Sequence, residues 1–203
     1  MSKVKSAAFF GFSWLPKTDP EWHDVYNFAK RLAEKDIEII DGGGPGVMLA
    51  ATEGAESVKD SRTTGVYYRP KDSTMFEGEA LANVADKKMY YADYVHRTLK
   101  LLELGDIYII FNGGTGTISE FGMAWGLARL YYGHHKPLIL FGDFWHEVLD
   151  SVIKNMHIRE EEKKVFHIVS NVDEAITVFD QLSQEISERS SFEATAEEAK
   201  FMI

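Results

Sequence analysis

Short apolar runs alternate with segments of helical period along almost the whole chain, and this alternation limits the possible folds more than any other feature. The runs are rich in Ile, Val, Phe and Tyr without strict polar alternation, as is typical of strands covered on both faces. The rhythm predicts an α/β fold, with helices wrapped around a parallel sheet. The expected strands lie at 6–12, 37–41, 63–68, 106–112, 136–142 and 166–171, and the expected helices at 21–35, 47–58, 92–104, 118–132, 144–154 and 172–186.

Length and composition indicate one compact domain, which we expect to span residues 1–182. With 203 residues, 45% of them hydrophobic, the chain can bury a substantial core. Residues 183–203 are rich in Glu and Ser, and chain termini tend to be poorly ordered, so we favour a frayed acidic tail there over a helix that docks on a partner. We interpret the polar segment 69–86 as a mobile loop beside the site or, equally, as a plain surface excursion.

Charge and residue usage exclude several functions. A formal net charge of -10 and a pI near 5.2 argue against broad nucleic-acid binding, which needs clustered Lys and Arg. The chain has no cysteine, so it can form neither disulfides nor Cys-ligated zinc sites, and its seven histidines lack ligand spacing; no metal site is expected. The first apolar run is broken by Ser13 and Pro16 and is too short to span a membrane, so we expect a cytoplasmic protein without a membrane partner.

Two glycine-rich clusters, DGGGPGVM at 41–48 and FNGGTGTISE at 111–120, each follow a predicted strand and open a predicted helix. In open α/β sheets, ligands bind at the carboxyl ends of the strands. Backbone N–H groups at a helix N-terminus lack internal partners, so each cluster can hold an anion without a lysine. Neither cluster matches GxGxxG or a P-loop, which disfavours a dinucleotide or ATP. The alternative is that both are tight turns that need positive φ.

Within the clusters, the glycines let a phosphate approach the backbone closely, and threonine hydroxyls add donors. The residues concerned are Gly42, Gly43, Gly44, Gly46, Gly113, Gly114, Thr115, Gly116 and Thr117. Glu120 completes a T-x-x-E pattern from Thr117, so it serves either the ligand or, as a capping box, its own helix.

In the 92–104 helix, Arg97 points away from the centre of the expected buried stripe, as a solvated arginine would. That stripe comprises Tyr94, Val95, Leu99, Leu101 and Leu102.

These motifs, with VHRTLKLLELGD at 95–106 between them, resemble those of the LOG family, named for the cytokinin-activating "lonely guy" phosphoribohydrolases and often labelled lysine decarboxylase-like. The family motifs read GGGPGxM and PGGxGTxxE, and the resemblance runs from Ala7 to Ala175. It implies a Rossmann-like, doubly wound parallel sheet. It also implies a homodimeric enzyme that hydrolyses the N-glycosidic bond of a nucleoside 5′-monophosphate to free base and ribose 5-phosphate.

The resemblance makes Arg97 and Glu120 the catalytic pair. Glu120 would stabilise an oxocarbenium-like state and orient a water, from a first helical turn whose dipole favours the ionised carboxylate. Arg97 would clamp the phosphate or neutralise the departing base. Gly113–Thr117 would hold the 5′-phosphate, and the nucleotide pocket would comprise Gly11, Ser13, Gly42, Gly43, Gly44, Gly46 and Met48. No cofactor is expected, because nothing in the sequence suggests a pyridoxal phosphate site with its Schiff-base lysine.

Two positions depart from the family pattern and leave substrate choice and full activity open. Asn112 stands where the family has proline, and Thr98 where a basic residue usually follows the arginine. A second hypothesis is therefore a non-catalytic binding or carrier protein that holds a phosphorylated cofactor, such as the molybdenum cofactor, in the same loops. A third, a nucleotide sensor, has only the acidic tail in its favour. We interpret Tyr90, Tyr91 and Tyr94 as core residues in preference to base-stacking ones.

Overall fold

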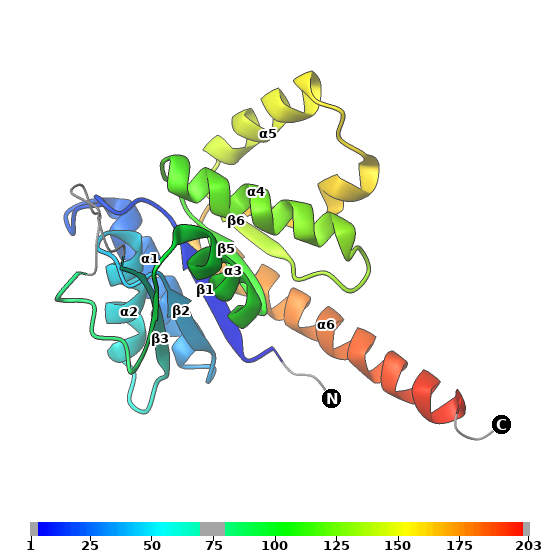
Figure 1. Ribbon diagram of the computed structural model, residues 1–203, viewed down its shortest axis with the longest axis horizontal. Helices are drawn as coiled ribbons and strands as arrows, with labels where there is room; N and C mark the ends of the chain where they lie inside the picture. The colour runs from blue at the N-terminus through cyan, green and yellow to red at the C-terminus, as the bar shows by residue number, and fades with distance from the viewer. Residues whose placement is uncertain (1–3, 70–79, 201–203) are drawn as a thin grey trace.

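Seven parallel strands form one sheet within the residues that the computed structural model describes, 4–69 and 80–200, with side chains up to Arg189 (Figure 1). The strand order is β4-β3-β2-β1-β5-β6-β7, and each neighbouring pair is parallel. The strands are β1 Ser6–Phe10, β2 Glu38–Asp41, β3 Thr63–Tyr68, β4 Lys87–Tyr91, β5 Ile107–Ile110, β6 Leu138–Phe141 and β7 Phe166–Val169. The predicted α/β fold is confirmed.

Helices cover both faces of this sheet, so the doubly wound arrangement is also confirmed. On one face pack α1 Pro20–Ala33, α2 Val47–Glu56 and α6 Val172–Lys200, and on the other α3 Tyr94–Leu104, α4 Thr115–Leu130 and α5 Phe144–Asn155. A short 3-10 helix, η1 Glu160–Lys164, precedes β7. Because both faces are covered, the strands bury side chains in both directions, which explains their unbroken apolar runs.

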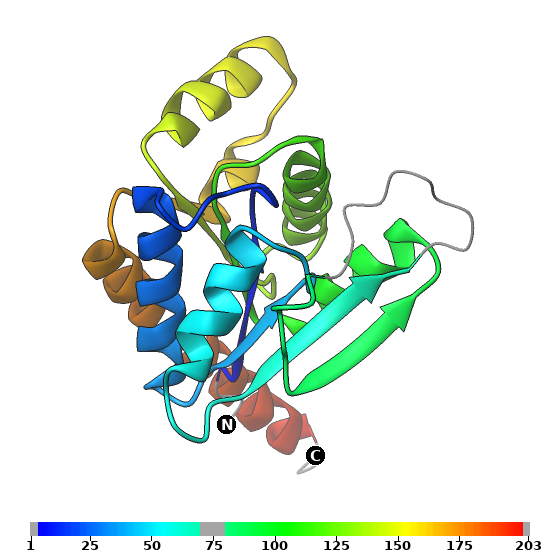
Figure 2. The same ribbon diagram turned by 90° about the vertical axis from the view of Figure 1, so that its left-hand side faces the viewer.

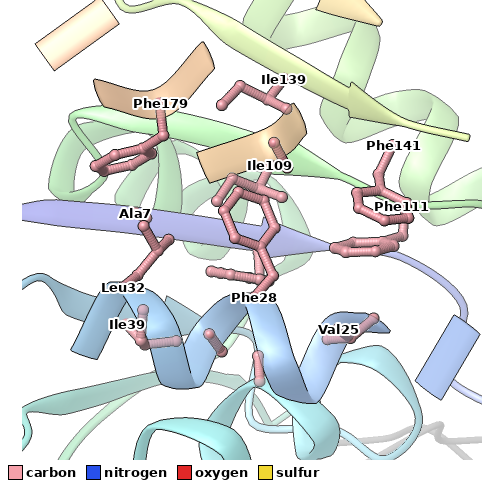
Figure 3. Close-up of a cluster of buried hydrophobic side chains, with 14 of the residues drawn as sticks. Ala7, Val25, Phe28, Leu32, Ile39, Ile109, Phe111, Ile139, Phe141 and Phe179 are labelled. Atoms are coloured by element: carbon pink, nitrogen blue, oxygen red, sulfur yellow. The ribbon is translucent and has the colours of Figure 1, made fainter. Parts of the chain in front are cut away.

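Alternate residues of each central strand feed two separate cores. In β1, Ala7 and Phe9 belong to the core under α1, α2 and α6, whereas Ala8 and Phe10 belong to the core under α3, α4 and α5. Figure 3 shows the first core, in which Phe28 of α1 lies over the sheet beside Phe111 and Phe141. The rings of Phe111 and Phe141 are stacked with centroids 4.6 Å apart. The two cores fix the sheet between rigid helical layers.

The sheet edge at β3 and β4 differs from the sequence prediction, which had no strand at 87–91 (Figure 2). This edge strand was missed because its side chains are largely exposed or half-buried, so it lacks the apolar run of a central strand. The expected mobile loop lies largely at 70–79, outside the described residues. Asp86, at its end, is fixed to β3: its carboxylate accepts from the Thr63 N–H at 3.0 Å.

The expected frayed tail is also different in the structure. Helix α6 does not end at the expected residue 186 but continues to Lys200. Its first turns pack on the sheet through Ala175, Ile176 and Phe179, and the helix then runs on beyond the sheet (Figure 1). Preferring a tail over a helix was therefore wrong, because helix propagation from a well-packed start costs little per residue. The proposed division of the chain at 182/183 stays a prediction.

Candidate functional site

A cavity of about 360 Å³, here called the cleft, opens at the carboxyl ends of β1, β2 and β5. The strand order places β1 between β2 and β5, so the loops that follow these three strands meet at one point where the sheet reverses its winding. Most of the predicted site residues line the cleft: Gly11, Ser13, Gly42, Gly44, Met48, Arg97, Gly114, Thr115, Gly116, Thr117 and Glu120. The structure thus brings both glycine clusters together, while their roles toward a ligand stay predictions.

Three predicted residues, Gly43, Gly46 and Gly113, do not line the cleft but shape its walls. Gly43 and Gly46 have φ of +70° and +67°, which side chains rarely tolerate. A Cβ on Gly43 would lie 2.0 Å from the Tyr67 ring, and one on Gly113 would lie 2.1 Å from the Thr117 hydroxyl. Gly43 and Gly46 are therefore required by their turn, as the tight-turn alternative proposed, whereas Gly113 has no positive φ and is constrained by its contact with the Thr117 side chain.

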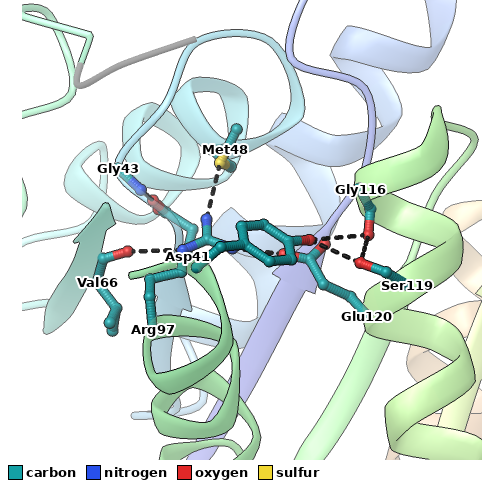
Figure 4. Close-up of polar contacts among 9 residues, drawn as sticks. Asp41, Gly43, Met48, Val66, Arg97, Gly116, Ser119 and Glu120 are labelled. Atoms are coloured by element: carbon teal, nitrogen blue, oxygen red, sulfur yellow. Dashed lines mark hydrogen bonds and ion pairs between the residues drawn. The ribbon is translucent and has the colours of Figure 1, made fainter. Parts of the chain in front are cut away.

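Arg97 and Glu120 form a buried ion pair across the cleft, from α3 to α4 (Figure 4). The Arg97 Nη1 to Glu120 Oε1 distance is 2.5 Å, and both residues are 7% exposed. Arg97 Nε also donates to the Val66 carbonyl oxygen at 3.0 Å. The expected buried stripe, with Arg97 pointing away from its centre, was wrong: α3 turns Arg97, Thr98, Leu101 and Leu102 inward, and leaves Val95 and Leu99 exposed.

Glu120 does not cap its helix. The structure starts α4 at Thr115 with Gly114 as the N-cap, so Glu120 lies in the second turn and the capping-box interpretation fails. Burial raises the pKa of Glu120, and the charge of Arg97 and its hydrogen bond oppose that shift. Desolvation, rather than the helix dipole that we expected, thus dominates the titration of this carboxyl group, and a raised pKa makes the carboxylate a stronger base.

The N-terminus of α4 lines the same cleft, one to two turns before Glu120. Its N-cap, Gly114, offers no side-chain hydrogen bond, so the first N–H groups of the helix face the cleft without a cap. A Cβ at Gly114 would meet nothing within 4 Å, which leaves open space directly against this backbone. The Tyr94 hydroxyl contacts Ser119 Oγ at 2.8 Å and donates to the Gly116 carbonyl oxygen at 3.2 Å, and so joins α3 to the first turns of α4. The uncapped N–H groups and the open space beside them make the N-terminus of α4 suitable for binding an anion.

The first glycine cluster lies directly against Arg97. A Cβ on Gly42 would lie 1.6 Å from Arg97 Nη2, so only glycine leaves room for the guanidinium group. Met48 Sδ is 4.0 Å from the same nitrogen (Figure 4). Gly42 is thus required by the neighbouring arginine rather than by its own backbone angles.

A buried carboxylate that the sequence prediction missed lies beneath this cluster. Asp41, the last residue of β2, is 1% exposed and accepts hydrogen bonds from the Gly43 N–H at 2.6 Å, Thr52 Oγ1 at 2.5 Å and Asn83 Nδ2 at 3.2 Å. Burial raises its pKa to about 6, against these hydrogen bonds and the charge of Arg97. A charged residue at the end of an otherwise apolar strand was the available signal.

The free energy of unfolding is expected to depend on pH through the Asp41 carboxyl group. Because its pKa is raised from 3.8 to about 6, its contribution to stability is complete below the unfolded pKa and is lost as the pH rises through about 6. The free energy of unfolding of the wild type, minus that of Asp41→Asn, should fall by about 2 kcal/mol between pH ~4 and pH ~7. Urea titrations at several pH values measure this difference, and a difference independent of pH would contradict it.

The segment after β1 joins the two glycine clusters. The Phe12 N–H donates to the Asn112 carbonyl oxygen at 2.8 Å, and the Phe12 carbonyl oxygen accepts from the Val47 N–H at 3.0 Å. At the position of the family's proline, Asn112 keeps an N–H group, which donates to Glu21 Oε1 at 3.2 Å. At the second departure, the buried Thr98 hydroxyl has no hydrogen-bond partner among the described residues. Neither residue lines the cleft, and the Arg97–Glu120 ion pair is formed with both of them present.

The three tyrosines occupy different environments. Tyr94 lines the cleft, together with Phe12 and Tyr68. Tyr90 is 45% exposed and stacks on Tyr67 with ring centroids 5.1 Å apart, and Tyr91 packs partly buried against the second core. The interpretation of all three as core residues was therefore wrong for Tyr90 and Tyr94. Aromatic faces at the mouth of the cleft can stack on a planar ring.

Within the described part of the chain, no lysine lines the cleft, and no group of three or more His, Asp or Glu side chains lies close enough to hold a metal ion. In the same residues, no helix is long and apolar enough to cross a membrane.

Comparison with known proteins adds a family and several similar folds. The structure is similar to that of TM1055, at 20% sequence identity, over 88% of this chain and 99% of the other, with a TM-score of 0.67. It is also similar to the molybdenum cofactor binding protein from Rippkaea orientalis (20% identity, 90% and 99% covered, TM-score 0.65). A third similar structure is the molybdenum cofactor carrier protein from Chlamydomonas reinhardtii (18% identity, 89% and 98% covered, TM-score 0.63). At these identities the likeness concerns the fold.

Comparison with curated proteins gives no match. A family model described as "Possible lysine decarboxylase" matches residues 48–179, more than half of the chain. This range contains Arg97, Glu120 and the whole second glycine cluster. The chain therefore belongs to the family of possible lysine decarboxylases, the LOG-like family that its two glycine motifs resemble.

Proposed function

We propose that the protein is a nucleoside 5′-monophosphate phosphoribohydrolase, an N-glycosidase that acts in the cytoplasm without a cofactor. The observation that carries this proposal is the buried Arg97–Glu120 pair, which lines the same cleft as the open N-terminus of α4. The cleft thus offers backbone donors for a phosphate together with a carboxylate and a fixed positive charge for the glycosidic bond.

In this proposal the 5′-phosphate binds the N–H groups of α4, at Gly114 to Thr117, and the ribose lies toward Glu120. The base lies toward the aromatic and thioether side chains of Phe12, Tyr68 and Met48, which line the remaining wall. The polar and apolar parts of the cleft therefore match the polar and apolar ends of a nucleotide.

The reaction follows from the charges on the cleft walls. As the C1′–N bond breaks, its electron pair leaves with the base, and the ribose gains oxocarbenium character that the Glu120 carboxylate stabilises. A water oxygen then bonds to C1′ while Glu120 accepts one proton from that water, and this proton passes on to the departed base, which restores the carboxylate and gives the neutral base and ribose 5-phosphate. Arg97 holds the carboxylate in position and offsets the negative charge that develops on the departing base.

The test is a panel of nucleoside 5′-monophosphates, including an N6-isopentenyl form. We expect equal amounts of free base and ribose 5-phosphate from at least one member, measured by chromatography. The matching nucleoside should react at least ~10²-fold more slowly, because it lacks the phosphate that orients the ribose. No release from any member, with binding still detected by thermal shift, would contradict the hydrolase proposal.

That contrary result would support the second candidate, a carrier that holds a phosphorylated cofactor without cleaving it. The names of two similar structures, a molybdenum cofactor binding protein and a molybdenum cofactor carrier protein, favour this candidate. A carrier needs the open backbone of α4 but no buried acid beside it. The Arg97–Glu120 pair therefore supports the enzyme over the carrier.

We also propose that the protein forms a homodimer through the outer faces of α3 and α4. Five apolar side chains are exposed there: Val95 (54%), Leu99 (44%), Ile118 (51%), Leu130 (65%) and Tyr131 (63%). Leu99 and Tyr131 border the same cavity of about 330 Å³, so the apolar surface of α3 adjoins that at the end of α4. Apolar surface gathered on neighbouring helices is typical of an interface.

Leu99→Asp should convert this dimer to a monomer at micromolar concentration, because a carboxylate buried at an interface without a partner is costly. Size-exclusion chromatography with light scattering measures the mass. Met156→Asp serves as the control, since Met156 is equally apolar and 62% exposed but follows α5. A wild-type protein that is already monomeric would contradict the dimer.

A further inference from the structure

Three buried polar side chains form a hydrogen-bonded group that contacts the backbone of the first glycine cluster. They are Asp41 at the end of β2, Thr52 on α2, and Asn83 before β4. All three are at most 1% exposed. Asp41 Oδ1 accepts from the Gly43 N–H at 2.6 Å and from Asn83 Nδ2 at 3.2 Å. Asn83 Nδ2 also donates to the Gly44 carbonyl oxygen at 3.2 Å. The group therefore holds both a donor and an acceptor of this backbone, and Figure 4 shows Asp41 and Gly43 beside Arg97.

Thr52 has one hydroxyl proton and two acceptors within reach. Its Oγ1 lies 2.5 Å from Asp41 Oδ2 and 3.1 Å from Asn83 Oδ1. A hydroxyl group donates one hydrogen bond and can accept another. When Asp41 is ionised, Thr52 donates to it. When Asp41 carries a proton on Oδ2, that proton can be donated to Thr52 Oγ1, and Thr52 can turn to donate to Asn83 Oδ1.

The hydrogen bonds to Asp41 Oδ1 are the same in both states. The Gly43 N–H and Asn83 Nδ2 both donate to Oδ1, whereas the proton is gained and lost at Oδ2. Every N–H and O–H donor in the group keeps an acceptor in both states, while Asn83 Oδ1 receives the Thr52 proton only when Asp41 is protonated. The Gly43–Gly44 backbone has no reason to move.

Charged and titratable groups from three elements act on this carboxyl group. Arg97 on α3 favours its ionised form, and Glu56 on α2 interacts with it unfavourably. The Tyr67 hydroxyl on β3 donates to the Asn83 carbonyl oxygen at 3.2 Å. Burial raises the pKa of Asp41 to about 6, so both forms are populated near neutral pH.

The position of this backbone matters to the site because Gly42 lies against the guanidinium group. A Cβ at Gly42 would lie 1.6 Å from Arg97 Nη2, so a small displacement of the cluster changes the space that Arg97 occupies. Arg97 in turn holds Glu120.

We propose that Asp41 is a positioning residue for Arg97, and that the Thr52 hydroxyl reorients when Asp41 gains or loses a proton, so that the Gly42–Gly44 wall keeps one conformation in both states. This holds for any ligand of the cleft and does not depend on the hydrolase activity. The cleft can therefore accept a change of charge behind its wall without a change of shape.

The test uses the free protein and NMR hydrogen exchange at Gly43, with wild type, Thr52→Val, Thr52→Ser and Asp41→Asn. In the wild type, the Gly43 amide proton shift should titrate with a midpoint near pH ~6, while its protection from exchange stays within about twofold from pH ~5 to pH ~8. Asp41→Asn should abolish the titration and keep the protection, because a carboxamide makes the hydrogen bonds of the protonated carboxyl group.

Thr52→Val removes the acceptor for the Asp41 proton and also the hydroxyl group that donates to the ionised carboxylate. Both states then lose one hydrogen bond, so the protection of Gly43 should fall at least about tenfold at pH ~5 and at pH ~8, and the Arg97 Nε–H signal should weaken at both. Thr52→Ser restores the hydroxyl and should restore both readouts. A wild-type Gly43 shift that does not titrate between pH ~4.5 and pH ~8 overturns the proposal without any variant. A Thr52→Val variant whose Gly43 protection equals that of the wild type at both pH values overturns it as well.

Discussion

Glu120→Gln is expected to lower the rate of base release by about 10²- to 10⁴-fold while nucleotide affinity changes by no more than a few-fold. The amide keeps the size of the carboxylate but cannot accept a proton from water or stabilise an oxocarbenium ion by charge. Steady-state rates on the best substrate of the panel, with affinity from calorimetry, separate the two effects.

The control for this change is Glu147→Gln, on the exposed surface of α5. It makes the same chemical substitution away from the cleft and should leave the rate unchanged. A Glu120→Gln enzyme with the wild-type rate would show that this carboxylate takes no part in the reaction. Release that is lost together with nucleotide binding would instead assign Glu120 to binding.

Gly42→Ala is expected to break the Arg97–Glu120 ion pair without changing either residue. The added methyl group would lie 1.6 Å from Arg97 Nη2 and 2.7 Å from Cζ, so the guanidinium group has to leave its place. Separating a buried pair costs about 3–5 kcal/mol, because each charge loses its partner in a medium that solvates it poorly. We expect that loss in the free energy of unfolding, and a loss of base release similar to that of an Arg97 variant.

The matched control is Gly122→Ala on α4, where a Cβ would meet nothing within 4 Å. It should stabilise the protein by about 0.5–1 kcal/mol, since alanine is favoured over glycine within a helix. Gly114→Ala, also in open space but at the N-terminus of α4, should fold normally and weaken binding of a 5′-phosphate. If Gly42→Ala has the stability and the rate of base release of Gly122→Ala, the Arg97 guanidinium group does not lie against Gly42.

The fold could be predicted because its signal is repeated along the chain. Each central strand is an apolar run, and each glycine cluster marks a strand end that is followed by a helix. The strand order then brings the loops after β2 and β5 to the two sides of β1. The edge strand β4 carries no such signal, since solvent covers part of its surface.

The arrangement of the site depends on contacts between elements, which local patterns do not specify. The apolar stripe of α3 predicted an exposed Arg97, but the helix turns that arginine inward to Glu120 and exposes Leu99. Asp41 was missed for the same reason: its partners Thr52 and Asn83 are distant in sequence, and only the folded chain brings them together. Buried polar residues are recognised by their partners, not by their spacing.

The hydrogen bond between the Asn112 N–H and Glu21 also makes these two distant positions depend on each other during evolution. A lineage that acquires proline at position 112 loses the only backbone donor there, and a half-buried carboxylate is left behind at position 21. Such a proline is tolerated best where residue 21 has already lost its charge, so the order in which the two substitutions arise is constrained. Sequences within the family that differ at position 112 should therefore also differ at position 21.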